Sequence, residues 1–195
     1  MHTKKKLLLF IPVLIWMAVI FWFSSNNGDT SSSQSSRVSY IFASAADKAF
    51  RLDMSDAERM NFSERISFLV RKTAHFSEYF ILSMLLYIAV GINFGKMLDL
   101  IDASMKIFHV IRIRYLLPVI IVFGYAGTDE LHQYFVPERC CSFRDVLIDT
   151  AGGLAAVLMI ILIRYIHGQI AYNRARRSVQ VEKDENMKKK KKTGN

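Results

Sequence analysis

Four long apolar blocks constrain the fold of this chain more than any other feature of its sequence. Uncharged runs extend from Leu7 to Phe23, Phe80 to Phe94, Leu116 to Thr128 and Thr150 to Ile163. With its flanks, each block reaches the roughly 20 residues that a helix needs to cross a hydrocarbon layer about 30 Å thick. The blocks are apolar on every face and lack the polar stripe of a water-exposed helix. We therefore predict an all-α integral membrane bundle of four transmembrane helices, at about residues 7–23, 73–95, 115–136 and 144–166.

The distribution of the basic residues predicts how the bundle is oriented. The formal net charge is +9, and most of the Lys and Arg residues lie in three segments: Lys4–Lys6, Lys96–Arg114, and the tail from Arg174 to Lys192. The segments expected on the other side carry mixed charge. With four spans, all three segments lie on one side, which the positive-inside rule makes cytoplasmic. We expect a membrane domain at 1–172 and a basic tail at 173–195, with both termini cytoplasmic. The charge is then explained by orientation and by anionic lipid, without nucleic acid as a partner.

The segment between the first two spans has its own pattern. Residues 24–36 are rich in Ser, Asn and Gly, which predicts a flexible linker on the outer side. From Val38 to Phe50 apolar residues recur at helical spacing, which predicts an amphipathic helix on the outer membrane surface. Ser55 and Glu58 have the spacing of a capping box at the start of a further helix. In the third span, Pro118 is expected in the first turn, where its missing amide costs little.

Polar residues interrupt the apolar blocks at positions that this topology brings together. The second span begins with RKTAHFSEY, the third ends with GTDELHQYF and the fourth begins with RDVLID. Because these spans run inward, outward and inward again, all three clusters fall in the outer layer of the membrane. Ionisable residues at such depth are costly and usually functional. The candidate site residues are Lys72, His75, Glu78, Asp129, Glu130, His132, Gln133, Arg139, Asp145 and Asp149.

The fourth span also indicates which of its faces points inward. Asp145, Asp149, Gly152 and Ala156 share one helical stripe, because residues three and four apart lie on the same face. Small residues let helices approach closely within lipid, so this stripe should face the bundle and carry its acids inward. In the preceding loop, Arg139 is placed to pair with a carboxylate below it.

Several of these motifs resemble those of the VanZ-like membrane proteins. The resemblance rests on RKTAHFSEYFILSMLLY, on GTDELHQYFVPERCCSFRDVLIDTAGG and on IFWFSSN at the end of the first span. Family members usually carry Gly after the proline, then Arg and small residues; here Glu138 replaces that Gly, and Cys140 and Cys141 fill the small positions. Glu does not easily replace Gly where φ is positive. The resemblance implies a bacterial cell-membrane protein. Its namesake is associated with resistance to the glycopeptide teicoplanin, and a lipid-linked envelope precursor or a glycopeptide is an implied partner, besides the lipid bilayer.

A first hypothesis is an enzyme with a metal-assisted or acid/base site that opens to the outer leaflet. A carboxylate and an imidazole stand three residues apart in His75 with Glu78 and in Asp129 with His132, a spacing that lets one helix supply two ligands to a divalent metal. The sequence has no HExxH, CxxC or phosphate-binding glycine loop. The catalytic candidates are His75, Glu78, Asp129, Glu130, His132 and Asp145. Glu130, Asp145 and Asp149 could complete the metal shell or act as general base.

Two other hypotheses need no catalysis. In one, the cluster binds an envelope ligand or partner protein: Arg139 and Arg144 hold an anionic group, with Lys72, Gln133 and Asp149 as further contacts. In the other, the polar residues form a structural network, in which each interhelical bond contributes about 1 kcal/mol. Ion transport is less well supported, since no charge continues between Ile81 and Phe94.

Overall fold

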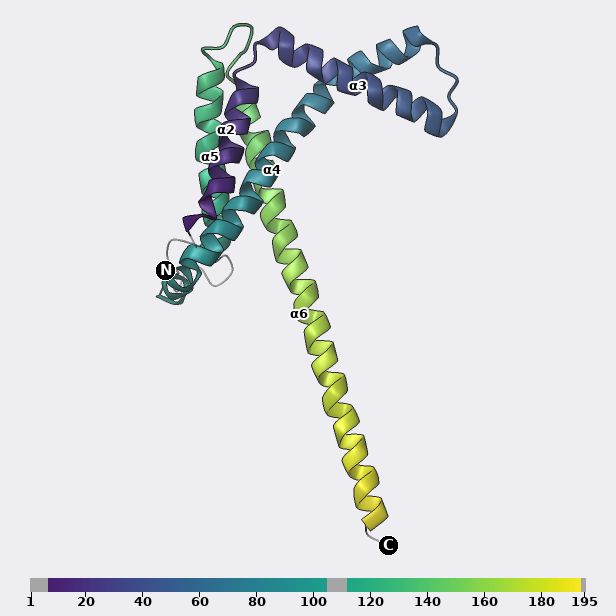
Figure 1. Cartoon of the computed structure of the whole chain (residues 1–195), viewed down its shortest axis with the longest axis vertical. Coiled ribbons are helices and arrows are strands. Elements are labelled where there is room, and N and C mark those ends of the chain that lie inside the picture. Colours follow the sequence, from purple (N-terminus) through teal and green to yellow (C-terminus); the bar gives the residue numbers. More distant parts are fainter. Residues whose placement is uncertain (1–6, 105–111, 194–195) are drawn as a thin grey trace. The chain divides into compact units, whose positions relative to one another are not determined.

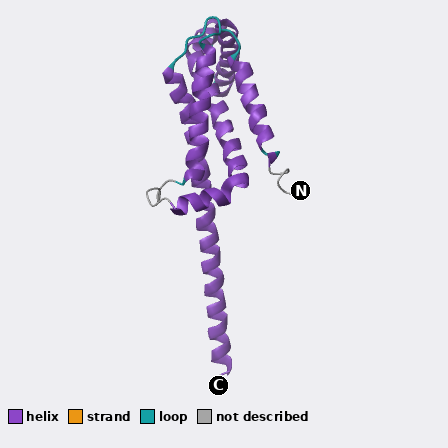
Figure 2. Cartoon of the chain, turned by 90° about the vertical axis from the view of Figure 1, so that its left-hand side faces the viewer, coloured by secondary structure: helices purple, strands orange, loops and turns teal. Residues whose placement is uncertain are grey.

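The computed structural model of the chain describes residues 7–104 and 112–193, and its regular structure there is entirely helical (Figure 2). The helices are α2 (Phe10–Ser24), α3 (Gly28–Phe50), α4 (Asp56–Ser104), α5 (Ile113–Gln133) and α6 (Phe143–Thr193) (Figure 1). The chain divides into two units, residues 1–157 and residues 158–195. All contacts described below lie within the first unit. The all-α prediction is confirmed.

The number of helices that could cross a membrane is smaller than the four expected. Within the described residues, α4 and α6 are each long and apolar enough, over Asp56–Ile101 and Phe143–Gln180. The pair α2 and α3 also qualifies when it is taken as one span bent by 104°. Helix α2 by itself has 15 residues, short of the roughly 20 of a full span. Helix α5 carries Arg114 near its start and Asp129 and Glu130 near its end. The fold therefore provides two or three candidate spans.

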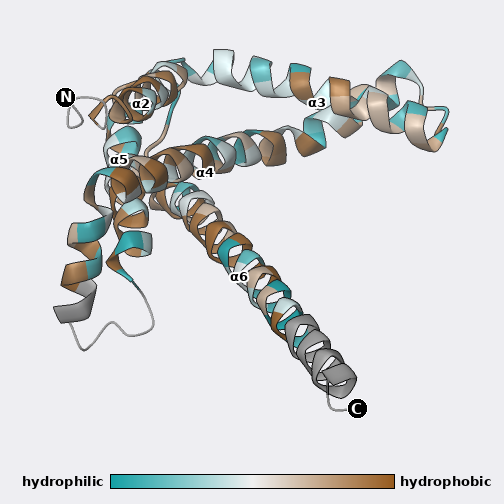
Figure 3. Cartoon of the chain, turned by 60° about the horizontal axis from the view of Figure 1, so that its bottom comes forward, coloured by the Kyte–Doolittle hydropathy of each residue, from teal (hydrophilic) through white to brown (hydrophobic). Residues whose placement is uncertain are grey.

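The expected linker at residues 24–36 is wrong, because α3 begins at Gly28. Asn27 caps this helix, and its side-chain oxygen accepts a hydrogen bond from the Thr30 amide at 2.9 Å. The serines that follow remain helical because their hydroxyls bond within the helix, as in the 2.7 Å bond from Ser39 Oγ to the Ser35 carbonyl. Figure 3 shows the change from apolar residues along α2 to polar residues at the start of α3.

Helices α3 and α4 form a hairpin, and the amphipathic helix predicted for residues 38–50 is the second half of α3. A stripe at a spacing of four residues is buried in α3: Ser35, Ser39, Ala43 and Asp47. These small side chains allow α3 to pack along α4. Larger apolar side chains on α3 stay at the surface, with Ile41 67% exposed.

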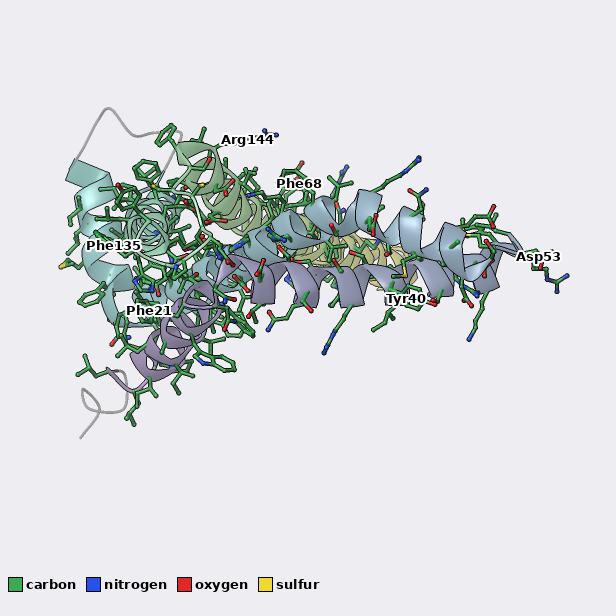
Figure 4. All side chains as sticks on the ribbon, turned by 90° about the horizontal axis from the view of Figure 1, so that it is seen from above. Phe21, Tyr40, Asp53, Phe68, Phe135 and Arg144 are labelled. Carbon is green, nitrogen blue, oxygen red and sulfur yellow. The ribbon has the colours of Figure 1, made fainter. Side chains whose placement is uncertain are left out.

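The predicted capping box at the start of α4 is confirmed. The Glu58 amide donates to Ser55 Oγ at 3.3 Å, and the Ser55 amide donates to Glu58 Oε2 at 2.8 Å. Each side chain therefore satisfies an amide that the first helical turn would leave free. Beside it, Asp47 of α3 accepts from the Met54 amide at 3.0 Å and pairs with Arg59 at 2.9 Å. These bonds close the hairpin, whose far end carries Asp53 (Figure 4).

The core lies where α2, α4, α5 and the start of α6 meet. Its buried apolar residues are Val13, Ile20, Tyr79, Leu82, Leu86, Ala89, Val122, Ala126 and Val146. The prediction that the stripe of Asp145, Asp149, Gly152 and Ala156 points inward is confirmed: Asp149, Gly152 and Ala156 are buried, and Asp145 is partly buried. A Cβ at Gly152 would overlap the Phe76 carbonyl of α4. The backbones of α4 and α6 therefore approach closely at this point.

The position of Pro118 differs from the prediction, and some of the basic residues used to predict the orientation lie outside the described part of the chain. Helix α5 begins at Ile113, so Pro118 lies in its second turn and not in its first. There, the missing amide removes a bond that an interior residue would make. Side chains of three basic segments used for orientation, Lys4–Lys6, Lys106 and Lys188–Lys192, are not among those described.

Candidate functional site

The carboxylate of Asp129 joins three helices. Asp129 is 2% exposed. Its Oδ2 accepts hydrogen bonds from Ser24 Oγ at 2.8 Å, Tyr79 Oη at 3.2 Å and Gln133 Nε2 at 3.1 Å. The donors come from the end of α2, the middle of α4 and the last turn of α5. Its Oδ1 is buried and has no hydrogen-bonding partner among the residues that the structure describes. One oxygen of Asp129 thus ties the helices together, while the other remains able to accept a bond.

Gln133 extends this network to the loop after α5. Its side-chain oxygen accepts a bond from Arg139 Nη1 at 2.9 Å, and Arg139 Nε donates to the Asn26 carbonyl at 3.2 Å. The expected carboxylate partner of Arg139 is therefore wrong, because the amide of Gln133 lies between the guanidinium and Asp129. Burial, and then the nearby charge of Arg71, lower the pKa of Arg139 from its ordinary value.

The loop that carries Arg139 is attached to the start of α3. The Gly28 amide donates to the Pro137 carbonyl at 3.2 Å, and the Asp29 amide donates to Glu138 Oε2 at 3.3 Å. A Cβ at Gly28 would overlap the Glu138 carbonyl. Glu138 itself has a φ of 61°, the left-handed conformation that favours glycine. The residue that replaces the usual Gly thus keeps a glycine-like backbone at this position.

Ion pairs and hydrogen bonds also connect the start of α6 with α4 and α5. Lys72 Nζ lies 2.6 Å from Asp145 Oδ2, with both side chains partly buried. Glu130 is buried, and its Oε2 accepts a bond from the Ser142 amide at 2.8 Å, just before α6 begins. This bond gives Glu130 a structural role. Lys72 and Asp145 together fix the side of α6 that faces α4.

Asp149 is the most deeply buried acid of the cluster. Its side chain is on the inward face of α6, one turn before Gly152, and the residue is 1% exposed. Neither carboxylate oxygen has a hydrogen-bonding partner among the described residues. A buried carboxylate without a partner is costly to retain as an anion. Asp149 is therefore placed to bind a proton or a donor group.

The two histidines of the predicted site lie apart. His75 Nδ1 is 3.7 Å from Glu78 Oε2, beyond hydrogen-bonding distance. Both atoms are buried, and neither has a hydrogen-bonding partner in the described part of the chain. His132 instead faces α2, where it stacks on Phe21 with ring centroids 4.3 Å apart and lies 3.2 Å from Ser25 Oγ. In the described part of the chain, no three His, Cys, Asp or Glu side chains are grouped so that they could hold a metal ion. The structure therefore does not gather the four expected metal ligands.

Two neighbouring cavities lie beside this network and share Arg71, His75 and Arg139. The first, about 270 Å³, is lined mainly by apolar groups, and the second, about 320 Å³, is mainly polar. The first is completed by Phe23, Ser31, Gln34, Ser35, Val38, Val70, Ala74 and Glu78. The second is completed by Gly28, Asp29, Ser32, Lys72, Gln133, Glu138, Cys140 and Asp145. The predicted residues Asp129, Glu130, His132 and Asp149 line neither cavity.

The contribution of α3 to these cavities was missed from the sequence. Arg71 Nη2 donates to Ser32 Oγ at 2.8 Å, and Arg71 Nε lies 3.5 Å from Ser35 Oγ. A segment interpreted as a linker offers no fixed side chains, so these serines were not candidates. Arg71 had a signal, since it stands four residues before His75 on the same stripe of α4.

The fold and the buried polar network define the chain as an all-α membrane protein with several candidate spans. Residues 9–164 match the model of the family described as VanZ/LLP1, and the chain belongs to this family. The matched range contains all the candidate site residues from Lys72 to Asp149. No curated protein and no solved structure matches the chain.

Proposed function

We propose that the chain is a bacterial cell-membrane protein with four spans and cytoplasmic termini, which binds an anionic group of an envelope ligand beside Arg71 and Arg139. The basic flanks of the apolar blocks support the orientation. The packing of the short helix α2 and of α5 against α4 supports the additional spans. In this orientation, the cavities beside Arg71 and Arg139 open on the outer side of the membrane.

The observation that carries the binding proposal is the bonding of the two arginines at the cavities. The side-chain hydrogen bonds described for Arg71 go to serine hydroxyls, and those of Arg139 go to an amide and a carbonyl. Of the carboxylates that line the two cavities, Asp145 pairs with Lys72 and Glu138 accepts a backbone amide. Asp29 and Glu78 also line the cavities, but neither bonds to an arginine in the described part of the chain. Guanidinium groups bind carboxylates and phosphates through charge-assisted bonds. Two guanidinium groups oriented by neutral partners therefore form a site for an anion.

Titration of the purified protein in detergent micelles with glycerol phosphate, followed by calorimetry, tests this proposal. Saturable binding is expected for the wild type and is lost in Arg71→Gln and in Arg139→Gln. The matched control is Arg144→Gln. Arg144 was predicted to hold the anion with Arg139, but it is exposed, lines neither cavity and lies at the edge of the helices in Figure 4. Binding that survives in Arg139→Gln, or that is lost equally in Arg144→Gln, would contradict the proposed site.

A second candidate function is acid/base catalysis on the bound ligand. His75 and Glu78 line the same cavity as the arginines, and each has a buried polar atom without a partner. A carboxylate and an imidazole within reach of a ligand can transfer protons to and from it. Mass spectrometry of envelope extracts incubated with the protein should then reveal a product that Glu78→Gln abolishes while binding is retained. Without any product, the binding function alone stands.

The physiological setting of the proposal comes from the family. The namesake of the family is associated with resistance to teicoplanin, so the anionic ligand is expected to belong to cell-envelope metabolism. The test uses a strain that lacks this chain and receives either the wild type or Arg139→Gln in trans. Its sensitivity to teicoplanin shows whether the cavity serves that response. Equal complementation by wild type and variant would separate the cavity from resistance.

A further inference from the structure

The cavity beside Arg71 has one apolar side and one polar side. We infer that the ligand is an anionic lipid, with its charged head group against Arg71 and Arg139 and the start of its hydrocarbon chain in the apolar cavity. This inference rests on the proposed anion-binding function and names the class of ligand.

The division between the two cavities is the first argument. Phe23 of α2, Val38 of α3, and Val70 and Ala74 of α4 contribute the apolar wall of the first cavity. The second cavity is lined by polar groups of the α3 start, of α4 and of the loop that carries Arg139. Because both cavities include Arg71 and Arg139, a molecule bound to these arginines meets hydrocarbon on one side and polar groups on the other. An amphiphile with an anionic head has this distribution.

The position of the apolar cavity along the chain is the second argument. Phe23 stands at the end of α2, an apolar helix, and the chain then bends by 104° into the polar start of α3. Such a change, from an apolar helix to a polar one that runs across it, is typical of the level where lipid head groups meet acyl chains. The apolar cavity is lined by α3 and α4, and by Phe23 at the end of α2 where this change occurs. A lipid in the surrounding bilayer can therefore present its head group and first methylene groups at the same level.

Size is the third argument. The volumes of about 270 and 320 Å³ each lie near the lower end of the range of small-molecule sites. Together they can hold a head group and the nearest part of a chain, and the rest of the chain must stay outside. A lipid meets this condition because the remainder of its chains stays in the membrane. A small water-soluble anion would leave the apolar cavity unused.

Native mass spectrometry of the full chain in detergent micelles can test the inference with three probes: dioleoyl phosphatidic acid, dioleoyl phosphatidylcholine and glycerol phosphate. Phosphatidic acid is expected to bind at least about tenfold more tightly than glycerol phosphate, the effect of burying a few methylene groups. It is also expected to bind more tightly than phosphatidylcholine, whose head group carries no net charge. Val38→Trp, which fills the apolar cavity, should weaken the binding of phosphatidic acid but not that of glycerol phosphate.

Ile41→Trp is the matched control, because Ile41 lies nearly one turn further along α3, is 67% exposed and does not line the cavity. This variant should bind all probes as the wild type does. Equal affinity for phosphatidic acid and glycerol phosphate, or no effect of Val38→Trp, overturns the lipid inference and leaves the anion site intact. Equal affinity for the two lipids overturns the requirement for an anionic head. Absence of binding by all three probes removes the proposed function itself.

Discussion

The polar residues of this protein form two regions that differ in how completely they are bonded. Around Asp129, one carboxylate oxygen receives bonds from Ser24, Tyr79 and Gln133, and all four residues are almost completely buried. Around Arg71 and Arg139, charged groups face open cavities and are oriented by neutral partners. The first region has the properties of a structural network, and the second has those of a binding site. Charged residues in one layer of a helical bundle can thus serve two different purposes.

The largest effect is expected from Asp129→Ala, which removes the centre of the bonded region. The variant leaves the hydroxyl of Tyr79 and the amide of Gln133 buried without their acceptor. Each unsatisfied buried donor costs about 1–3 kcal/mol, so a loss of about 2–6 kcal/mol of stability is expected from these two donors. Thermal unfolding in detergent, followed by circular dichroism, measures this loss. Asp29→Ala, at an exposed position, should unfold like the wild type; equal destabilisation by both would remove the distinction between the regions.

A somewhat smaller loss is expected from Gly152→Ala, at the closest approach of α6 to α4. The added Cβ overlaps the Phe76 carbonyl, which cannot rotate away. Overpacking of this kind costs about 1–3 kcal/mol. Gly127→Ala in α5 is the control, because a Cβ there meets nothing within 4 Å. The same unfolding assay should show no loss, or a slight gain, for Gly127→Ala, and a stable Gly152→Ala protein would show that α6 can move away from α4.

A substitution in the region around Arg71 and Arg139 should change ligand binding more than the stability of the fold. Arg139→Gln is expected to weaken binding of an anion by at least about tenfold, since a bond to a charged group contributes about 1.5–3 kcal/mol. The two hydrogen bonds described for Arg139 go to neutral groups, so the unfolding temperature of the variant protein should change little. Calorimetric titration and unfolding of the same preparation give both quantities. A large loss of stability with unchanged affinity would show that Arg139 has a structural role and does not bind the anion.

The smallest effect is expected at the boundary between the regions, from Glu138→Gly. Glu138 holds a φ of 61°, and glycine adopts this conformation without the penalty of about 1 kcal/mol that a side chain incurs. The variant loses one long, exposed hydrogen bond to the Asp29 amide. A net gain of up to about 1 kcal/mol is expected from thermal unfolding. Glu64→Gly, at an exposed site inside α4, should have the opposite sign; a loss in both variants would show that the Asp29 bond outweighs the backbone conformation.

Much of the candidate site could be predicted from periodicity alone. Within one helix, residues three and four apart share a face, so the inward position of Asp149, Gly152 and Ala156 follows from the spacing of small residues. The capping box of Ser55 and Glu58 is equally local and was predicted correctly. What could not be predicted is which side chain meets which across helices. Gln133 intervenes between Arg139 and Asp129, and His132 turns to Phe21 of α2, because these contacts depend on helix rotation and separation.

The sequence by itself determined the helical class, the membrane-compatible blocks, the family and the identity of the polar residues. These properties depend on composition and on spacing within a single helix, which local physical chemistry controls. Only the tertiary structure decided that the serine-rich segment after α2 is a helix, and that its hydroxyls orient Arg71. It also decided that an apolar and a polar cavity meet at the two arginines. Such features arise from the packing of segments far apart in the chain, where no local pattern determines the distance between side chains.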